Sequence, residues 1–341
     1  MFSRFVALFA ALVLVVIPMR AGAQTPPTAA SVEALLGEMS AWMADYYSVS
    51  QSAPLDIDGY LNVLDRLDTR ELTEAQAITA LTQWRDRSLA TNGDARRRAG
   101  ILRQPPSMAM LGQRGANLDT IMQASYDGLG ALLDSQGVLI ERLAEMGVGG
   151  IREPAKLQDA RVRAVIESQL QILGVAERRV RISAAALSAD HPNNAVFEAG
   201  LEFYEALSAI ARNELARLDG GGDPSAVART LRSSASEMRV ELARAARLAE
   251  GLRQSARWQH TPDTERLATV IVRLAETYPE LLANYGVLAD ALDRAATNIE
   301  AGGAVVDAWA DLEEEVEAPL ANIARLDRER AAMLGQISPT L

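Results

Sequence analysis

Apolar residues return every three or four positions along most of this chain, and this spacing restricts the fold more than any other feature of the sequence. The clearest run alternates steps of four and three and contains Leu267, Ile271, Leu274, Tyr278, Leu281, Tyr285, Leu288, Leu292, Ala295 and Ile299. Such spacing keeps one side of a helix against a partner helix. No stretch shows the two-residue alternation of a half-buried strand. The sequence therefore predicts an all-α fold.

Proline and glycine mark where these helices are expected to begin and end. Pro154, Pro192, Pro224 and Pro262 each open a periodic run, as is typical of the first helical position. Glycines that favour a helix C-terminus lie at 147, 149, 150, 220–222 and 302–303. The expected helices span residues 31–49, 58–67, 73–89, 107–146, 154–187, 193–218, 224–258, 262–299 and 304–337, with a break at Asn92-Gly93-Asp94.

Short glycine-rich links between long helices force neighbouring helices to run antiparallel. We therefore expect an elongated antiparallel bundle of long amphipathic helices with coiled-coil-like seams. Residues 31–104, with shorter helices, are expected to form a cap region, residues 105–337 the long-helix bundle, and 338–341 a tail. A tetratricopeptide array is a weaker alternative, because its helices would be far shorter than these.

The N-terminus has the pattern of a secretion signal. Arg4 precedes an apolar run over 5–17, and Ala21-Gly22-Ala23 offers small residues for cleavage after Ala23. This predicts a signal at 1–23, a flexible leader at 24–30, and a periplasmic or secreted protein with no stable membrane span after processing. The alternative is a signal kept as an anchor, although the run is shorter than the roughly 18–20 residues that cross a bilayer. The chain has no cysteine, which excludes disulfides and thiolate metal sites.

Charge is the next guide to function. The formal net charge of −11 opposes nucleic-acid binding. One basic cluster stands out in this acidic chain, made of Arg96, Arg97, Arg98 and Arg103. We interpret it as a candidate patch for an anionic partner, the alternative being solvation or pairing with the protein's own acids.

Two prolines fall inside the last two predicted helices. With the turn at 302–303, Pro279 and Pro319 lie at nearly the same level of an antiparallel hairpin. Because each proline removes a backbone donor and kinks its helix, the sequence predicts a shared hinge there. Two independent kinks are the alternative.

Signs of catalysis and of cofactor binding are missing from the sequence. His191 and His260 are the only histidines, and neither occurs in a Glu-x-x-His pair of the di-iron type. No Gly-x-Ser-x-Gly nucleophile motif occurs. We therefore expect a non-enzymatic protein without metal or cofactor, with its tryptophans anchoring the core.

Two functions remain open at this point. The first is an exported helical scaffold of the cell envelope that binds a protein partner or a second copy through long helical faces. The alternative is a ligand-binding or sensor-like bundle that holds a small apolar or lipid-like molecule between helices. The sequence identifies neither the partner or ligand nor the oligomeric state.

Overall fold

The computed structural model describes residues 55–109, 113–187, 189–258 and 265–335, together with scattered positions between 35 and 52. The predicted signal, leader and tail, and His260 with the start expected at Pro262, lie outside the described residues. The elements are α2 (Ile57–Asp68), α3 (Glu74–Ile101), α4 (Gln113–Arg152), the short 3₁₀ helix η4 (Pro154–Lys156), α5 (Leu157–Ala186), α6 (Pro192–Leu218), α7 (Pro224–Trp258), α8 (Glu265–Glu276), α9 (Tyr278–Glu300) and α10 (Val305–Gly335).

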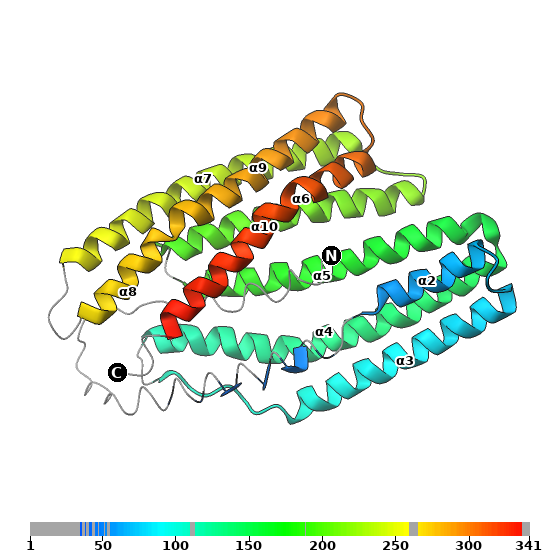
Figure 1. Cartoon of the computed structure of the whole chain (residues 1–341), viewed down its shortest axis with the longest axis horizontal. Helices are drawn as coiled ribbons and strands as arrows, with labels where there is room; N and C mark the ends of the chain where they lie inside the picture. Colours follow the sequence, from blue (N-terminus) through cyan, green and yellow to red (C-terminus); the bar gives the residue numbers. More distant parts are fainter. Residues whose placement is uncertain are drawn as a thin grey trace.

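The predicted all-α bundle is confirmed, and no strand occurs among the described residues. Figure 1 shows the helices running side by side along the long axis of the molecule, with α7 and α9 on one side and α3 on the other. Packing follows chain order from α3 to α7, and α9 then joins α7 to α10. Short links between consecutive helices give neighbours opposite directions.

The apolar interior is divided into three clusters. The largest is built from α5, α6, α7, α9 and α10. A second joins the described residues near the N-terminus to α3 and α4, and a third joins α2, α3, α4 and α5. Helix α5 therefore takes part in two clusters, with Ala164 in one and Ile166 in the other.

The ends of the C-terminal helices follow from local chemistry. Asp223 caps α7, since its Oδ1 accepts from the backbone N–H of Ala226 at 3.0 Å. Gly220 and Gly302 have φ values of 80° and 93°, which side chains with a Cβ rarely adopt. The backbone N–H of Gly303 then donates to the carbonyl of Asn298 at 2.9 Å, closing α9. The helix ends predicted at these glycines are confirmed.

The break expected at Asn92-Gly93-Asp94 is wrong, because α3 continues without interruption to Ile101. Asn92 is buried against α4, and its Nδ2 donates to the carbonyl of Leu133 at 3.0 Å. Its amide is thus satisfied by tertiary structure, and it does not compete for the backbone of its own helix. Tertiary packing overrides the local turn preference at this point.

The helix end expected at Gly147, Gly149 and Gly150 is also wrong, since α4 runs on to Arg152. A Cβ on Gly147 would lie 2.7 Å from Cδ1 of Leu81 and 2.9 Å from the hydroxyl of Tyr60. On Gly150 it would lie 3.1 Å from the Cα of Leu157. Two of these glycines therefore allow neighbouring helices to approach closely, and they do not supply a left-handed turn.

Gly147→Ala is accordingly expected to destabilise the protein by about 1–3 kcal/mol, because Leu81 and Tyr60 are fully buried and have no room to retreat. The matched control is Gly130→Ala in the same helix, where a Cβ meets nothing within 4 Å. That change is expected to stabilise by about 0.5–1 kcal/mol. Urea unfolding followed by circular dichroism measures both, and equal effects from the two variants would contradict the close-approach role of Gly147.

The single helix expected over 262–299 is interrupted at Thr277, between α8 and α9. Pro279 is the second residue of α9 and has no N–H to donate to the preceding turn. The hydroxyl of Thr277 donates to the carbonyl of Leu274 at 2.7 Å at the end of α8. By contrast, Pro319 lies inside α10, which continues through it. A bend shared by the two prolines stays a prediction.

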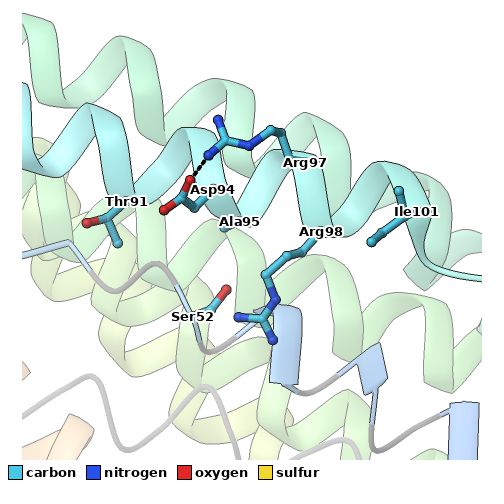
Figure 2. A pocket seen from close by; sticks show the side chains of 7 residues that line it. All are labelled: Ser52, Thr91, Asp94, Ala95, Arg97, Arg98 and Ile101. Atoms are coloured by element: carbon cyan, nitrogen blue, oxygen red, sulfur yellow. Dashed lines mark ion pairs between the residues drawn. The ribbon is translucent and has the colours of Figure 1, made fainter.

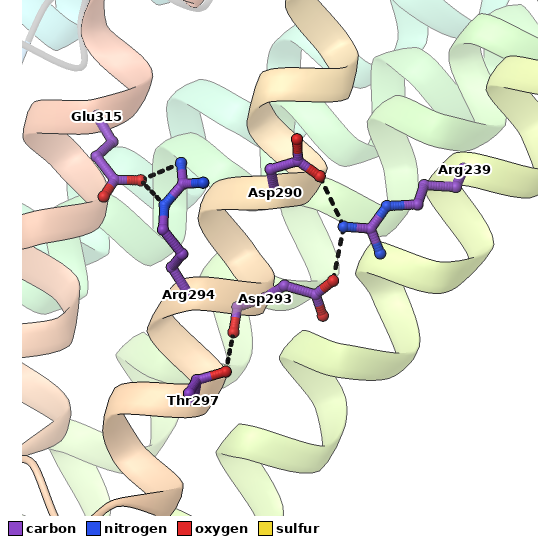
Figure 3. A network of polar contacts seen from close by, with 6 residues as sticks. All are labelled: Arg239, Asp290, Asp293, Arg294, Thr297 and Glu315. Carbon is purple, nitrogen blue, oxygen red and sulfur yellow. Dashed lines mark hydrogen bonds and ion pairs between the residues drawn. The ribbon is translucent and has the colours of Figure 1, made fainter.

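Ion pairs on the surface connect the C-terminal helices. Figure 3 shows Arg239 of α7 between Asp290 and Asp293 of α9, at 2.8 and 2.6 Å, and Arg294 of α9 on Glu315 of α10 at 2.6 Å. Exposed pairs of this kind contribute little stability individually. They follow the lateral order α7–α9–α10 that the shared apolar core sets.

Candidate functional site: an arginine-lined pocket and a buried polar cluster

A shallow pocket of about 500 Å³ lies on the outer face of α3. Its lining residues are Ser52, Thr91, Asp94, Ala95, Arg97, Arg98 and Ile101. Figure 2 shows Arg97 directed to Asp94, while Arg98 extends toward Ser52. The pocket therefore contains two of the four arginines that the sequence marked for an anionic partner.

The four arginines do not converge on one point. Arg96 pairs with Asp134 of α4, and Arg97 pairs with Asp94. Arg98 donates from Nη2 to the hydroxyl of Ser48 at 2.8 Å. Within the described part of the chain, Arg98 and Arg103 form no ion pair, so half of the cluster has no acidic partner there.

Arg103 lies beyond the end of α3, outside the pocket lining. Its backbone carbonyl accepts from Nε1 of Trp42 at 2.8 Å, which ties this segment to the N-terminal helical residues. The side chain of Arg103 is exposed. The basic cluster is thus a dispersed surface feature, and two of its four arginines line the pocket.

A second candidate site is buried in the C-terminal helices, and we call it the core polar cluster. Its members are Asn193 and Tyr204 of α6, Tyr278 and Tyr285 of α9, and Asp327 and Arg330 of α10. All six are at least 95% buried. So many polar groups inside one helical core require specific partners.

Asn193 is the centre of the core polar cluster. Its Oδ1 accepts from Nη2 of Arg330 at 2.8 Å and from the hydroxyl of Tyr278. The guanidinium of Arg330 also lies 4.3 Å from the centroid of the Tyr278 ring, a cation–π arrangement. Two helices that are distant in sequence are therefore joined to the first turn of α6 through one amide.

The start of α6 is held in place by further polar contacts. His191 is its N-cap, and Nδ1 accepts from the backbone N–H of Asn193 at 3.0 Å. Nδ2 of Asn194 donates to the carbonyl of Ala184 at 2.9 Å, and Arg244 of α7 donates to Oδ1 of Asn194 at 2.8 Å. Asn193 is thus positioned by α5 and α7 as well as by its own helix.

Several atoms of the core polar cluster have no hydrogen-bond partner among the described residues. They are both carboxylate oxygens of Asp327, Nδ2 of Asn193 and Nη1 of Arg330. Each belongs to a side chain with no more than 3% of its residue surface exposed. Leaving such groups unpaired in a core is costly, so the site has unused capacity to bind.

Burial also controls the ionisation of this site. It raises the pKa of Asp327 to about 7, although the positive charge of Arg330 acts in the opposite direction. Burial raises the pKa of Tyr204 and Tyr285 as well, and the nearby charge of Asp327 raises both further. The carboxyl of Asp327 therefore exchanges its proton near neutral pH.

Metal binding has no support from the described side chains, where no group of three or more His, Asp or Glu residues is placed to hold an ion. No helix in the described ranges is both long and apolar enough to cross a membrane.

The sequence interpretation missed the core polar cluster, although a signal was present. Val316, Ile323 and Leu326 continue the apolar repeat of the last helix, and Asp327 and Arg330 follow at the same three- and four-residue spacing. Charged residues at positions that the repeat assigns to the core indicate a buried polar site.

Comparison with known proteins gives no relative from which a function could be inferred: no family model, no curated protein and no solved structure matches this chain.

Proposed function

We propose that the protein is a non-enzymatic, exported helical interaction protein of the cell envelope, which binds a protein partner or a second copy through its outward helical faces. The secretion pattern before Gln24 supports export, with cleavage after Ala23. The intact mass of protein recovered from the envelope checks this part of the proposal.

The character of the outer surface indicates the kind of contact. The large apolar side chains that are exposed on the described helices are few and dispersed, namely Ile101, Val138, Val240, Val287 and Val306. The apolar side of α9 is closed inside the chain, since Leu281, Leu288 and Leu292 are buried there. A partner would therefore contact mainly charged helical faces. Coiled-coil-like contacts with the partner would be limited to small apolar areas.

The observation that carries the proposal is the pocket on α3. It combines Arg98, which has no acidic partner among the described residues, with Ile101, which is 83% exposed. A guanidinium beside an exposed apolar group suits an acidic segment of a protein partner.

Replacing Arg96, Arg97, Arg98 and Arg103 together by glutamine is expected to leave the helical content unchanged and to reduce partner recovery about tenfold or more. Rim charges steer association and contribute modestly, and here four are lost at once. The measurement is crosslinking in the native envelope with identification of the captured proteins, together with light scattering of the purified chain.

The matched control removes four exposed arginines from other surfaces, Arg66, Arg85, Arg229 and Arg232. It should retain the partner. Equal recovery with both variants would exclude the pocket as the contact. A monomeric wild-type chain that captures nothing would contradict the interaction function itself.

A second candidate function is a sensor-like bundle that holds a small molecule between its helices. The core polar cluster favours it, because Asp327, Arg330 and Asn193 each keep a buried polar atom without a partner among the described residues. The polar character of these groups supports a polar ligand better than the apolar or lipid-like one expected from the sequence.

A further inference from the structure

We propose that the core polar cluster binds a small zwitterion, whose ammonium group meets Asp327 and whose carboxylate meets Arg330 and Asn193. This inference depends on the second candidate function, the ligand-holding bundle, and it specifies the chemical class of the ligand.

The unpaired atoms of the core polar cluster fall into two groups, one of hydrogen-bond acceptors and one of donors. Asp327 offers two acceptor oxygens, while Nη1 of Arg330 and Nδ2 of Asn193 are donors. The orientation of the Asn193 amide follows from its contacts, because its oxygen already accepts from Arg330 and Tyr278. A ligand with donors at one end and acceptors at the other would satisfy all three side chains.

Charge balance restricts the ligand further. Arg330 carries a positive charge, and ionised Asp327 balances it within the same core. A simple anion or cation would add an uncompensated charge to a buried site, which is strongly unfavourable. A molecule with both charges and no net charge avoids this cost.

Aromatic side chains border the charged groups of the core polar cluster. Tyr204, Tyr278 and Tyr285 surround the charged groups with aromatic rings, and the face of Tyr278 is already covered by Arg330. Tyr278 directly follows the interruption at Thr277, so the core polar cluster lies beside the junction of α8 and α9.

The experiment uses the mature full chain and isothermal titration at pH 8 with glycine, β-alanine, L-alanine and L-leucine as probes. Propionate and ethylamine are the matched single-charge analogues of L-alanine. We expect at least one zwitterion to bind at least tenfold more tightly than either analogue. Binding should also strengthen from pH 5 to pH 8, because Asp327 must be ionised to meet an ammonium group.

Variants separate binding from structure. Asp327→Asn is isosteric and should weaken binding at least tenfold and remove its pH dependence. Arg330→Lys keeps the charge but not the planar donor pair, and should weaken binding similarly. Asp290→Asn, an exposed carboxylate on α9, should bind like the wild type. Circular dichroism confirms that each variant is folded.

The outcomes distinguish this inference from the function on which it depends. Binding of single-charge analogues as tightly as zwitterions, unchanged binding by Asp327→Asn, or no binding of any probe would overturn the zwitterion site. Native mass spectrometry of the protein purified from its own envelope tests the broader candidate. An apolar ligand retained by Asp327→Asn would support a ligand-holding bundle and overturn the zwitterion, whereas no ligand by either method would remove both.

Discussion

Replacing Asp327 by asparagine is expected to stabilise the folded protein by about 4 kcal/mol at pH 8 and by less than about 1 kcal/mol at pH 4. Burial raises the pKa of this carboxyl from 3.8 to about 7 in the folded chain. Each unit of difference between folded and unfolded states corresponds to about 1.4 kcal/mol. The wild type must bury a negative charge above this pKa, and the asparagine variant never does.

The direction of the pH dependence follows from proton binding. Between about pH 4 and pH 7 the unfolded chain has released the Asp327 proton while the folded chain retains it, so wild-type stability falls as the pH rises through this range. Above about pH 7 both states are ionised and the contribution becomes constant. The groups that face the carboxyl are Tyr204 from α6, Tyr278 and Tyr285 from α9, and Arg330 from α10. Of these, only Arg330 favours the ionised form.

Urea unfolding of both proteins at half-unit steps from pH 4 to pH 8.5 measures this difference. The difference in unfolding free energy should grow up to about pH 7 and then level off. Asp290→Asn is the control, since Asp290 lies in an exposed ion pair with Arg239 at 2.8 Å and should change stability by no more than about 1 kcal/mol. A pH-independent difference for Asp327→Asn would mean that this carboxyl is solvated.

Trp84→Ala is expected to destabilise the N-terminal half of the molecule by about 3–5 kcal/mol. Trp84 is completely buried in the cluster formed by α2, α3, α4 and α5. Its ring lies 5.2 Å from that of Tyr60, and its Nε1 donates to the carbonyl of Asp56 at 2.7 Å. Truncation thus creates a large cavity and leaves that carbonyl without its indole donor.

Two further variants separate these contributions. Trp84→Phe keeps an aromatic ring but removes the indole donor, and should lose less than the alanine variant does. Val240→Ala, at a side chain that is 57% exposed, should change stability by less than about 0.5 kcal/mol. Circular dichroism during urea unfolding measures all three. A loss of under about 1 kcal/mol for Trp84→Ala would show that this core relaxes around the missing ring.

Periodicity was sufficient to predict the all-α fold and most helix boundaries, because a three- and four-residue repeat has no counterpart in a sheet. Periodicity did not, however, predict the structural role of each glycine. Gly302 ends a helix, whereas Gly147 lies inside one against Leu81. The sequence around a glycine does not reveal whether it provides a left-handed turn or room for a neighbouring side chain, since the second role depends on a residue far along the chain.

The roles of polar residues inside helices were equally hard to predict from the sequence. Asn92 resembled a helix breaker, yet it is buried and bonded to the carbonyl of Leu133, 41 positions away. The arginine cluster was visible in the sequence because its members are close neighbours there. The core polar cluster was not, because Asn193 and Arg330 meet only through the packing of α6 against α10. Only the spacing of Asp327 and Arg330 within their own helix pointed to it.

The position of α10 at the end of the described chain determines when the C-terminal interior can be completed. Asn193 cannot form its hydrogen bond with the guanidinium of Arg330, 137 positions later, until that residue has been synthesised. The helices up to α5 can bury their tryptophan-centred cluster before α10 is synthesised. The C-terminal cluster, by contrast, gains the buried side chains of Asp327 and Arg330 only when α10 has been synthesised, so prematurely terminated products would lack these two groups.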